Sequence, residues 1–317
     1  MQDYNSYTLH ALFAQSHIMS SKSTGRIETN PSRTADFACL LRAASYVDKR
    51  ECYSGPDSMA YMLIPPLLRL VVRSRWLFKL FSWPFFPSGM YEYVIARTRY
   101  FDAVFGEALE QGFDQIVIFG AGFDSRALRF NKLNKGTRVF ELDAPTTQQE
   151  KLKAYEVKKL VIPDNLIFVP IDFNKESLIE KMVQAGFSAG RKSLFLLEAV
   201  TMYLLRDAVE GTFRFISDVS GIGSLVVFDY IYAGVLRNEN KYYGERKISL
   251  KILAKVGEKW TFALEEGEDK SFLNRYGFSL KDHSGKPELE DRYFKDSKGV
   301  IVGKINGTGA MATGIKT

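Results

Sequence analysis

A strand–glycine turn–helix–strand pattern between Gln115 and Asp143 constrains the fold of this chain more than any other feature. The apolar run Ile116–Phe119 stops at Gly120–Gly122, a helical pattern follows, and a second apolar run ends at Asp143. Glycine has no Cβ, so a ligand can approach the backbone of such a turn closely. An acid about 20 residues further on can hydrogen-bond the two hydroxyls of a ribose. The pattern therefore predicts a nucleoside-binding unit, with a plain structural turn as the alternative.

The residues after the turn distinguish between kinds of nucleoside ligand. The sequence continues Phe123-Asp124-Ser125-Arg126, without the third glycine of the dinucleotide-binding pattern. A pyrophosphate prefers bare backbone amides at a helix N-terminus, and the carboxylate of Asp124 would repel it. A carboxylate suits a cationic ligand, such as an ammonium or a sulfonium. The turn thus favours S-adenosylmethionine (SAM) over NAD.

Composition indicates an ordinary globular protein. The chain has 317 residues, of which 46% are hydrophobic and 25% are charged, so it can form one large domain or a core domain with a smaller attachment. Cys39 and Cys52 fit no metal-binding spacing and no disulfide framework. We therefore expect a reduced, cytoplasmic protein without a metal site. No secretory leader and no apolar run of the ~20 residues that span a membrane are expected.

Strand and helix patterns alternate from residue 115 onward, which is typical of a parallel sheet. Seven strands are predicted at Ile116–Phe119, Arg138–Leu142, Leu166–Ile171, Leu194–Leu197, Leu225–Tyr230, Phe278–Lys281 and Val300–Ile305. Helices are predicted at Thr34–Asp48, Ser58–Phe81 with an interruption at Pro65-Pro66, Tyr91–Gln111, Thr146–Leu160, Lys175–Ala185, Asp207–Ser220 and Asn240–Val256. The fold class is therefore α/β, a doubly wound sheet with its ligand along the carboxyl edge. Residues 306–317 are small and polar and are interpreted as a flexible tail.

The stretch between Tyr61 and Tyr100 combines six basic residues, one acid and many aromatic residues. A cap of helices over a pocket explains this composition, and we expect the segment from Ser58 to Tyr93 to cover the substrate side. No nucleic-acid-binding pattern accompanies the charge, so a nucleic-acid partner is not expected. Membrane contact is not expected either, although arginines at helical spacing in LLRLVVRSRWLFKLF keep a membrane surface as the alternative.

Six motifs occur in one order along the chain. They are ARTRYFD at Ala96–Asp102, IFGAGFDSRALRF at Ile118–Phe130, VFELDAP at Val139–Pro145, VPIDF at Val169–Phe173, LLEAVTMYL at Leu196–Leu204 and FDY at Phe228–Tyr230. This series resembles the leucine carboxyl methyltransferase family of SAM-dependent enzymes, in its polyketide O-methyltransferase-like branch. The resemblance implies a class I, Rossmann-like methyltransferase sheet with a helical N-terminal cap. It also implies domain bounds of 1–95 for the cap, 96–305 for the SAM-binding domain and 306–317 for the tail.

The resemblance also implies the residues that bind the cofactor SAM. Gly120, Ala121 and Gly122 match the turn beneath the methionine part of SAM, and Asp143 matches the acid that binds the ribose. Asp172 and Phe173 match the pair that meets the adenine. Glu198 matches an acid near the methionine moiety. The arginine that binds the SAM carboxylate corresponds to Arg97, with Arg99 as the alternative.

The function implied is SAM-dependent O-methyl transfer to a carboxylate or hydroxyl of a small metabolite. A carboxylate is already ionised at neutral pH, whereas a hydroxyl needs a base. Of the three histidines only His283 is expected near the pocket, so the catalytic residues stay unassigned and carboxyl methylation is slightly favoured. The alternatives are methylation of a protein C-terminal carboxylate, a non-catalytic nucleoside-binding protein and, more distantly, an NAD-dependent oxidoreductase. The oligomeric state does not follow from the sequence.

Overall fold

A seven-stranded sheet forms the centre of the molecule. The computed structural model describes residues 32–82, 88–173, 176–242 and 259–317. The strands are β1 (Gln115–Phe119), β2 (Arg138–Asp143), β3 (Leu166–Pro170), β4 (Ser193–Leu197), β5 (Leu225–Ile231), β6 (Phe278–Ser284) and β7 (Gly309–Lys316). They lie in the order β3-β2-β1-β4-β5-β7-β6. The first five strands are parallel, and β7 runs antiparallel to both β5 and β6. The predicted doubly wound α/β sheet is confirmed.

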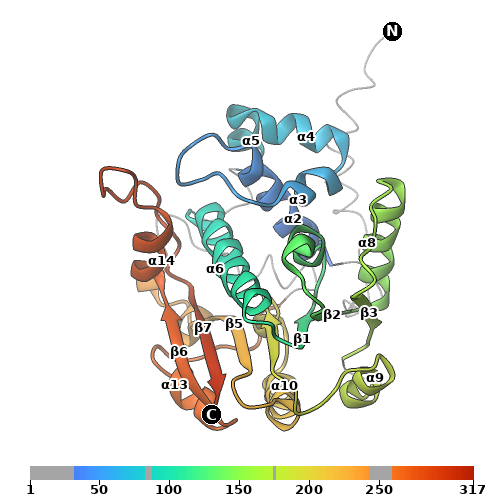
Figure 1. The fold of residues 1–317 in the computed structure, drawn as a ribbon. Helices are drawn as coiled ribbons and strands as arrows, with labels where there is room; N and C mark the ends of the chain where they lie inside the picture. The colour runs from blue at the N-terminus through green and yellow to red at the C-terminus, as the bar shows by residue number, and fades with distance from the viewer. Residues whose placement is uncertain (1–31, 83–87, 174–175, 243–258) are drawn as a thin grey trace, which may run out of the picture.

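The chain winds in opposite directions from β1, and this creates a switch point. From β1 it proceeds to β2 and β3 on one side, and then returns to place β4 and β5 on the other side (Figure 1). In open α/β sheets a ligand binds at such a switch point, outside the carboxyl ends of the strands. The fold therefore places any ligand site next to the ends of β1 and β4.

Helices cover both faces of this sheet and one of its ends (Figure 1). They are α2 (Arg33–Val47), α3 (Ser58–Leu63), α4 (Pro66–Arg73), α5 (Arg75–Ser82), α6 (Met90–Glu110), α7 (Arg126–Arg129), α8 (Pro145–Val157), α9 (Leu178–Gln184), α10 (Arg206–Val219), α11 (Ala233–Leu236), α13 (Asp269–Asn274) and α14 (Lys286–Tyr293). Short 3-10 turns occur at Asn131–Leu133, Thr201–Tyr203 and Asn240–Tyr242. In the described parts of the chain, no helix combines the length and the apolar character needed to cross a membrane.

Alternate residues of each central strand pack into two separate cores. In β1, Val117 and Phe119 join a core with α9, α10 and α13, whereas Ile116 and Ile118 join a core with α6 and α14. Successive side chains of a strand point to opposite faces, so a strand that is buried on both faces reads as a continuous apolar run. This explains why β1 and β4 were recognisable from the sequence.

The helices α2 to α5 form a layer at one end of the sheet, with α4 and α5 outermost (Figure 1). The side chains of Ser32 and Asp57 cap α2 and α3 by accepting backbone N–H groups. Pro66 begins α4, where its missing N–H costs nothing. The helix predicted over residues 58–81 is thus three helices, since the chain also breaks at Ser74.

The predicted domain boundary between residues 95 and 96 falls inside the continuous helix α6, and a boundary there would cut that helix.

The prediction of a flexible tail at residues 306–317 is wrong. Residues 309–316 form β7, which lies between β5 and β6. The small residues suggested a tail, but two of the glycines are needed because the backbone of β5 and a side chain of α13 approach β7 closely. A Cβ on Gly309 would lie 2.2 Å from the carbonyl oxygen of Tyr230, and one on Gly314 would lie 2.7 Å from a methyl group of Leu273.

The strand predicted at Val300–Ile305 is also wrong. Only Ile301 forms an isolated bridge, with Lys295, and Val300, Ile301 and Val302 are exposed. The run of apolar residues imitates a strand but lies outside the sheet, beside α14, where Val302 N–H donates to the Phe294 carbonyl. The helix predicted at Asn240–Val256 falls largely outside the described residues, since 243–258 are not among them.

Candidate functional site

Four of the sequence motifs meet at the carboxyl edge of the sheet. The turn Gly120–Gly122 follows β1, Asp143 ends β2, Asp172 follows β3 and Glu198 follows β4. These strands are parallel neighbours, so their ends lie at one edge and surround the switch point. The geometry brings together residues that are up to 78 positions apart in the chain.

The turn after β1 requires glycine for its own packing. Gly120 and Gly122 have φ angles of 58° and 48°, which side chains rarely adopt. A Cβ on Gly120 would lie 2.7 Å from Val200, and one on Gly122 would lie 3.0 Å from Ala35 of α2. The cap helix α2 therefore lies directly on this turn, and the glycines permit that approach as well as the approach of a ligand.

Asp143 supports the turn from the end of β2. Its carboxylate accepts the N–H groups of Gly122 and, at 2.7 Å, Ala144. Burial raises the pKa of this carboxyl group, while the two backbone N–H groups oppose that shift. Glu141, the other acid of β2, is turned away and pairs with the buried Lys151 at 2.5 Å. Of the two acids, Asp143 is thus the one placed against the glycine turn.

Asp172 and Phe173 form the third corner of the edge. Asp172 is buried, and its backbone N–H donates to the Glu176 carboxylate at 2.8 Å. The ring of Phe173 packs against the core, with its centroid 6.4 Å from that of Phe119. This arrangement provides an acid and an adjacent apolar wall.

The two candidate arginines have different surroundings. Arg97 is buried and donates to Glu198 Oε1 at 3.0 Å through Nε and to Asp229 Oδ2 at 3.2 Å through Nη1. Arg99 donates instead to the backbone carbonyls of Tyr293 and Ser54. The fold therefore brings Arg97, and not Arg99, to the end of β4.

Glu198 lies between two arginines. Its second carboxylate oxygen accepts a hydrogen bond from Arg126 at 2.6 Å. Burial acts to raise the pKa of Glu198, but the guanidinium groups of Arg126 and Arg97 outweigh it and hold that pKa below its usual value. Glu198 is accordingly a carboxylate at neutral pH.

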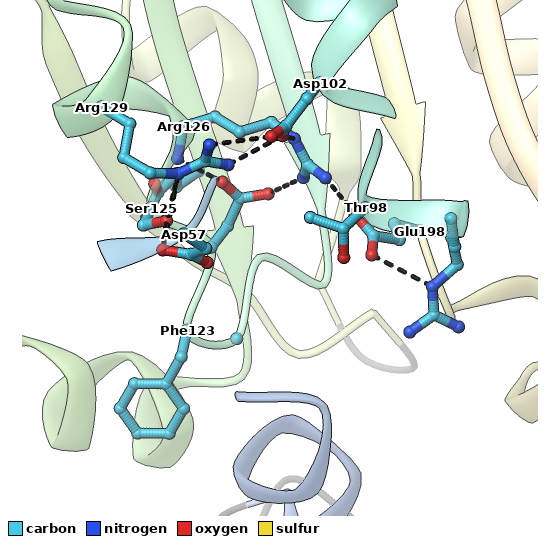
Figure 2. Close-up of polar contacts among 12 residues, drawn as sticks. Asp57, Thr98, Asp102, Phe123, Ser125, Arg126, Arg129 and Glu198 are labelled. Carbon is cyan, nitrogen blue, oxygen red and sulfur yellow. Dashed lines mark hydrogen bonds and ion pairs between the residues drawn. The ribbon is translucent and has the colours of Figure 1, made fainter. Parts of the chain in front are cut away.

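These contacts belong to one continuous buried network. Figure 2 shows Arg126 between Asp102 and Glu198, with Arg129 on the other side of Asp102. The network comprises Arg42, Arg97, Arg126, Arg129, Asp57, Asp102, Asp124, Glu198 and Asp229. With four arginines and five acids it holds one formal negative charge in excess. This excess suits a cationic ligand beside Glu198 better than an anionic one.

Comparisons with known proteins agree with this geometry. The sequence model described as leucine carboxyl methyltransferase matches residues 57–217, which is half of the chain. The chain belongs to the leucine carboxyl methyltransferase family. The matched residues run from the cap helix α3 to α10 and include all the edge residues described above.

Similar proteins are provisionally named as S-adenosyl-L-methionine-dependent methyltransferases. The YktD protein of Bacillus subtilis, named as an S-adenosyl-L-methionine-dependent methyltransferase, is 29% identical over 64% of this chain and 66% of its own length. A protein of Mycobacteroides abscessus with the same provisional description is 36% identical over 44% of this chain and 47% of its own. The chain thus spans from under half to just under two thirds of the length of these relatives. A solved structure from Thermobifida fusca, provisionally described as a methyltransferase, shares the fold with a TM-score of 0.57. The two proteins are 16% identical, and the match covers 90% of this chain and 98% of the other. The fold is therefore the class I methyltransferase fold of this family.

The expectation that Asp124 faces the ligand is wrong. Its carboxylate accepts the backbone N–H of Arg126 at 2.7 Å and pairs with the guanidinium group of the same residue. Arg126 also lowers the pKa of Asp124, against the effect of burial. An acid two residues before an arginine in a tight turn satisfies that arginine first, and so Asp124 belongs to the network rather than to the ligand surface.

Arg126 and Asp229 were not predicted to take part in this site. Asp229 accepts the backbone N–H of Ala199 at 2.6 Å and the Tyr93 hydroxyl at 3.3 Å, besides Arg97. A signal was available, because Asp229 interrupts the apolar strand β5, and a buried acid in such a strand needs a cationic or hydrogen-bonding partner. Nothing in the sequence indicated which arginine would pair with it.

His283 lies away from this site. It is on β6, and the strands β4, β5 and β7 separate β6 from β1. Its Nδ1 lies 2.6 Å from the buried carboxylate of Asp269 in α13. Across the described residues, no three His, Cys, Asp or Glu side chains are grouped so that they could hold a metal ion.

This His–Asp pair should make stability depend on pH. The hydrogen bond to Asp269 raises the pKa of His283 above its usual ~6.5. The protonated imidazole therefore stabilises the folded state fully below ~6.5, and this contribution is lost as the pH rises through the folded-state pKa. In an NMR titration His283 should titrate above ~6.5, and Asp269→Asn should lower its midpoint. A wild-type midpoint at or below ~6.5 would contradict the pairing.

Proposed function

We propose that this protein is a SAM-dependent O-methyltransferase that acts on a carboxylate of a small metabolite. One observation carries the proposal above all. Arg97 and Glu198 form a buried pair at the end of β4, next to the glycine turn after β1 and to the acids at the ends of β2 and β3. Family membership and the class I fold support it, and so does the provisional description shared by the relatives.

From β3 to β4, the edge residues match the parts of SAM in the order in which these parts would lie along the sheet. Asp172 and Phe173, after β3, would hold the adenine between an acid and an apolar wall. Asp143 would accept the ribose hydroxyls, because each of its oxygens retains lone-pair capacity beyond its one backbone bond. Gly120–Gly122, with Ala121, would pass beneath the methionine part. Arg97 would bind its carboxylate, and Glu198 would lie near its ammonium group.

When bound, SAM supplies an electrophilic methyl carbon on a sulfonium. The protein's contribution is then to position the acceptor in line with that carbon and to exclude water. A carboxylate acceptor needs no base, and among the edge residues described here the carboxylates of Glu198 and Asp229 are already committed to arginine. This supports a carboxylate over a hydroxyl as the acceptor.

The chemistry of the acceptor can be tested directly. Purified protein should transfer the labelled methyl group of SAM to members of a panel of small carboxylic acids, and mild alkali should release that label as methanol because the product is an ester. A label stable to alkali would assign the activity to hydroxyl methylation. Transfer only to peptides with a free C-terminus would favour the alternative, protein carboxyl methylation. Tight SAM binding without transfer to any of these would indicate a non-catalytic nucleoside-binding protein.

Matched arginine variants test the assignment of Arg97. Arg97→Gln should weaken SAM binding at least ~tenfold, because a charge-assisted hydrogen bond to the ligand carboxylate is lost. Arg99→Gln should leave the affinity within about twofold, because Arg99 donates to the backbone carbonyls of Tyr293 and Ser54 and not to Glu198. Calorimetric titration of both variants measures this. Equal losses, or a larger loss for Arg99→Gln, would contradict the assignment.

A further inference from the structure

The hairpin formed by α4 and α5 exposes a group of large apolar side chains. Leu70, Trp76 and Leu80 are 62%, 70% and 60% exposed, and Leu67 and Leu77 are also exposed. We call these five residues the outer patch. Isolated exposed apolar residues are normal, whereas a group on two adjacent helices marks an interaction surface.

The inner face of the same hairpin is anchored in the cap. Val72 is buried in a small core with Leu40 and Ala43 of α2, and Phe78 packs at its edge. The ring of Phe78 lies 5.5 Å from that of Tyr91. The hairpin is therefore held by its inner side chains, and the outer patch is not needed for the packing of the described residues.

The segment that carries the outer patch is basic and contains no acid in its sequence. Between Pro65 and Gly89 the chain has four basic residues, Arg69, Arg73, Arg75 and Lys79, and no Asp or Glu. Arg73 and Arg75 are exposed. A partner for this surface must therefore be both apolar and anionic.

Two partners that the protein itself could supply, a second copy of the chain and its own residues 1–31, fit this surface poorly. A second copy of this chain, related by a two-fold axis, would place the four basic residues against the same four basic residues. Residues 1–31 contain two acids, Asp3 and Glu28, and two basic residues, Lys22 and Arg26, so they offer no net charge to complement the patch.

We propose that α4 and α5 attach the protein to the surface of an anionic lipid bilayer. Helices with an apolar face, basic flanks and an exposed tryptophan lie in the plane of the membrane interface, where the aromatic ring and the leucines enter the acyl boundary and the basic groups meet lipid phosphates. From the sequence alone we expect no membrane contact, because a sequence does not show which side chains are exposed. The exposed fractions of the outer patch favour membrane attachment instead.

This attachment would also orient the candidate site. The same helical layer contacts the glycine turn, where Ala35 of α2 lies against Gly122 and Arg42 donates to the Phe123 carbonyl at 2.6 Å. The carboxyl edge of the sheet thus faces the layer that carries the outer patch (Figure 1). The proposal does not depend on the proposed enzymatic function, since it rests on the exposed surface alone.

Co-sedimentation with lipid vesicles tests the attachment. The full chain should bind vesicles of phosphatidylcholine mixed with phosphatidylglycerol, bind pure phosphatidylcholine weakly, and lose affinity as salt is raised. A variant combining Leu70→Ser, Trp76→Ser and Leu80→Ser should partition at least ~tenfold less. The matched control combines Val161→Ser, Leu205→Ser and Ile222→Ser. These residues are at least two thirds exposed and belong to other elements, so the control should bind as the wild type does.

Three results would overturn the proposal. The first is wild-type protein that binds the phosphatidylglycerol vesicles no better than pure phosphatidylcholine. The second is equal binding by the outer-patch variant, with its fold checked by circular dichroism. The third is self-association of the wild type in sedimentation velocity that the outer-patch variant abolishes while vesicle binding is unchanged, which would assign the patch to a second copy.

Discussion

Replacing Arg126 with methionine is expected to lower the free energy of unfolding by about 3–5 kcal/mol. Arg126 is 3% exposed and pairs with three carboxylates, those of Asp102, Asp124 and Glu198. Without the guanidinium group these acids stay buried with too few partners, and the unpaired charges cost far more than the lost contacts themselves. Denaturant unfolding measures the effect.

A surface arginine provides the matched control. Arg237 also pairs with two acids, Glu239 and Glu265, but its side chain is 52% exposed, so water screens the pairs. Arg237→Met should therefore shift the unfolding midpoint much less than Arg126→Met. Arg126→Lys should lie between the wild type and Arg126→Met, because it keeps the charge but not the forked geometry. Equal midpoints for Arg126→Met and Arg237→Met would mean that the buried network does not stabilise the fold.

Asp143→Ala is expected to weaken SAM binding tenfold or more. The variant removes the acceptor proposed for the ribose hydroxyls, and each hydrogen bond to a charged group contributes about 1.5–3 kcal/mol. It also removes the carboxylate that accepts the N–H groups of Gly122 and Ala144, so the turn itself should loosen. We therefore expect the affinity for S-adenosylhomocysteine to fall together with the affinity for SAM, and the melting temperature of the ligand-free protein to fall as well.

Asp164→Ala is the control for Asp143→Ala. Asp164 is exposed and precedes β3, at the opposite edge of the sheet, so its removal should leave both affinities unchanged. If Asp143→Ala binds SAM as tightly as the wild type does, the ribose is held elsewhere and the proposed arrangement along the edge is incorrect.

The parts of this fold that follow from local patterns were predictable from the sequence. The strands β1 to β6 were predicted to within three residues at each end. For β1, β2, β4 and β5 the reason is that strands buried on both faces form apolar runs. The strand β7 was missed, because its glycines and alanines have low strand propensity and become a strand only when β5 and β6 pair with them on either side. Tertiary packing, rather than propensity, determines that strand.

The sequence predicted which residues lie at the candidate site, but it did not predict which arginine pairs with which carboxylate. Sequence left Arg97 and Arg99 as alternatives, since both precede Tyr100 on the same helix. Only the crossing of α6 over β4 and β5 separates them, by turning Arg97 toward Glu198 and Asp229. For Asp124 the pairing is local, because its partner Arg126 lies two residues further on in the same turn, so this carboxylate is taken up by an ion pair rather than by a ligand.

Calorimetric titration of the wild-type protein with SAM, S-adenosylhomocysteine and NAD tests the central claim most directly. Asp143 at the end of β2, Asp172 after β3 and the excess negative charge of the arginine–carboxylate network favour a cationic nucleoside ligand over an anionic dinucleotide. We predict dissociation constants on the order of micromolar for SAM and S-adenosylhomocysteine, and no measurable binding of NAD. Measurable binding of NAD without binding of SAM would contradict the account.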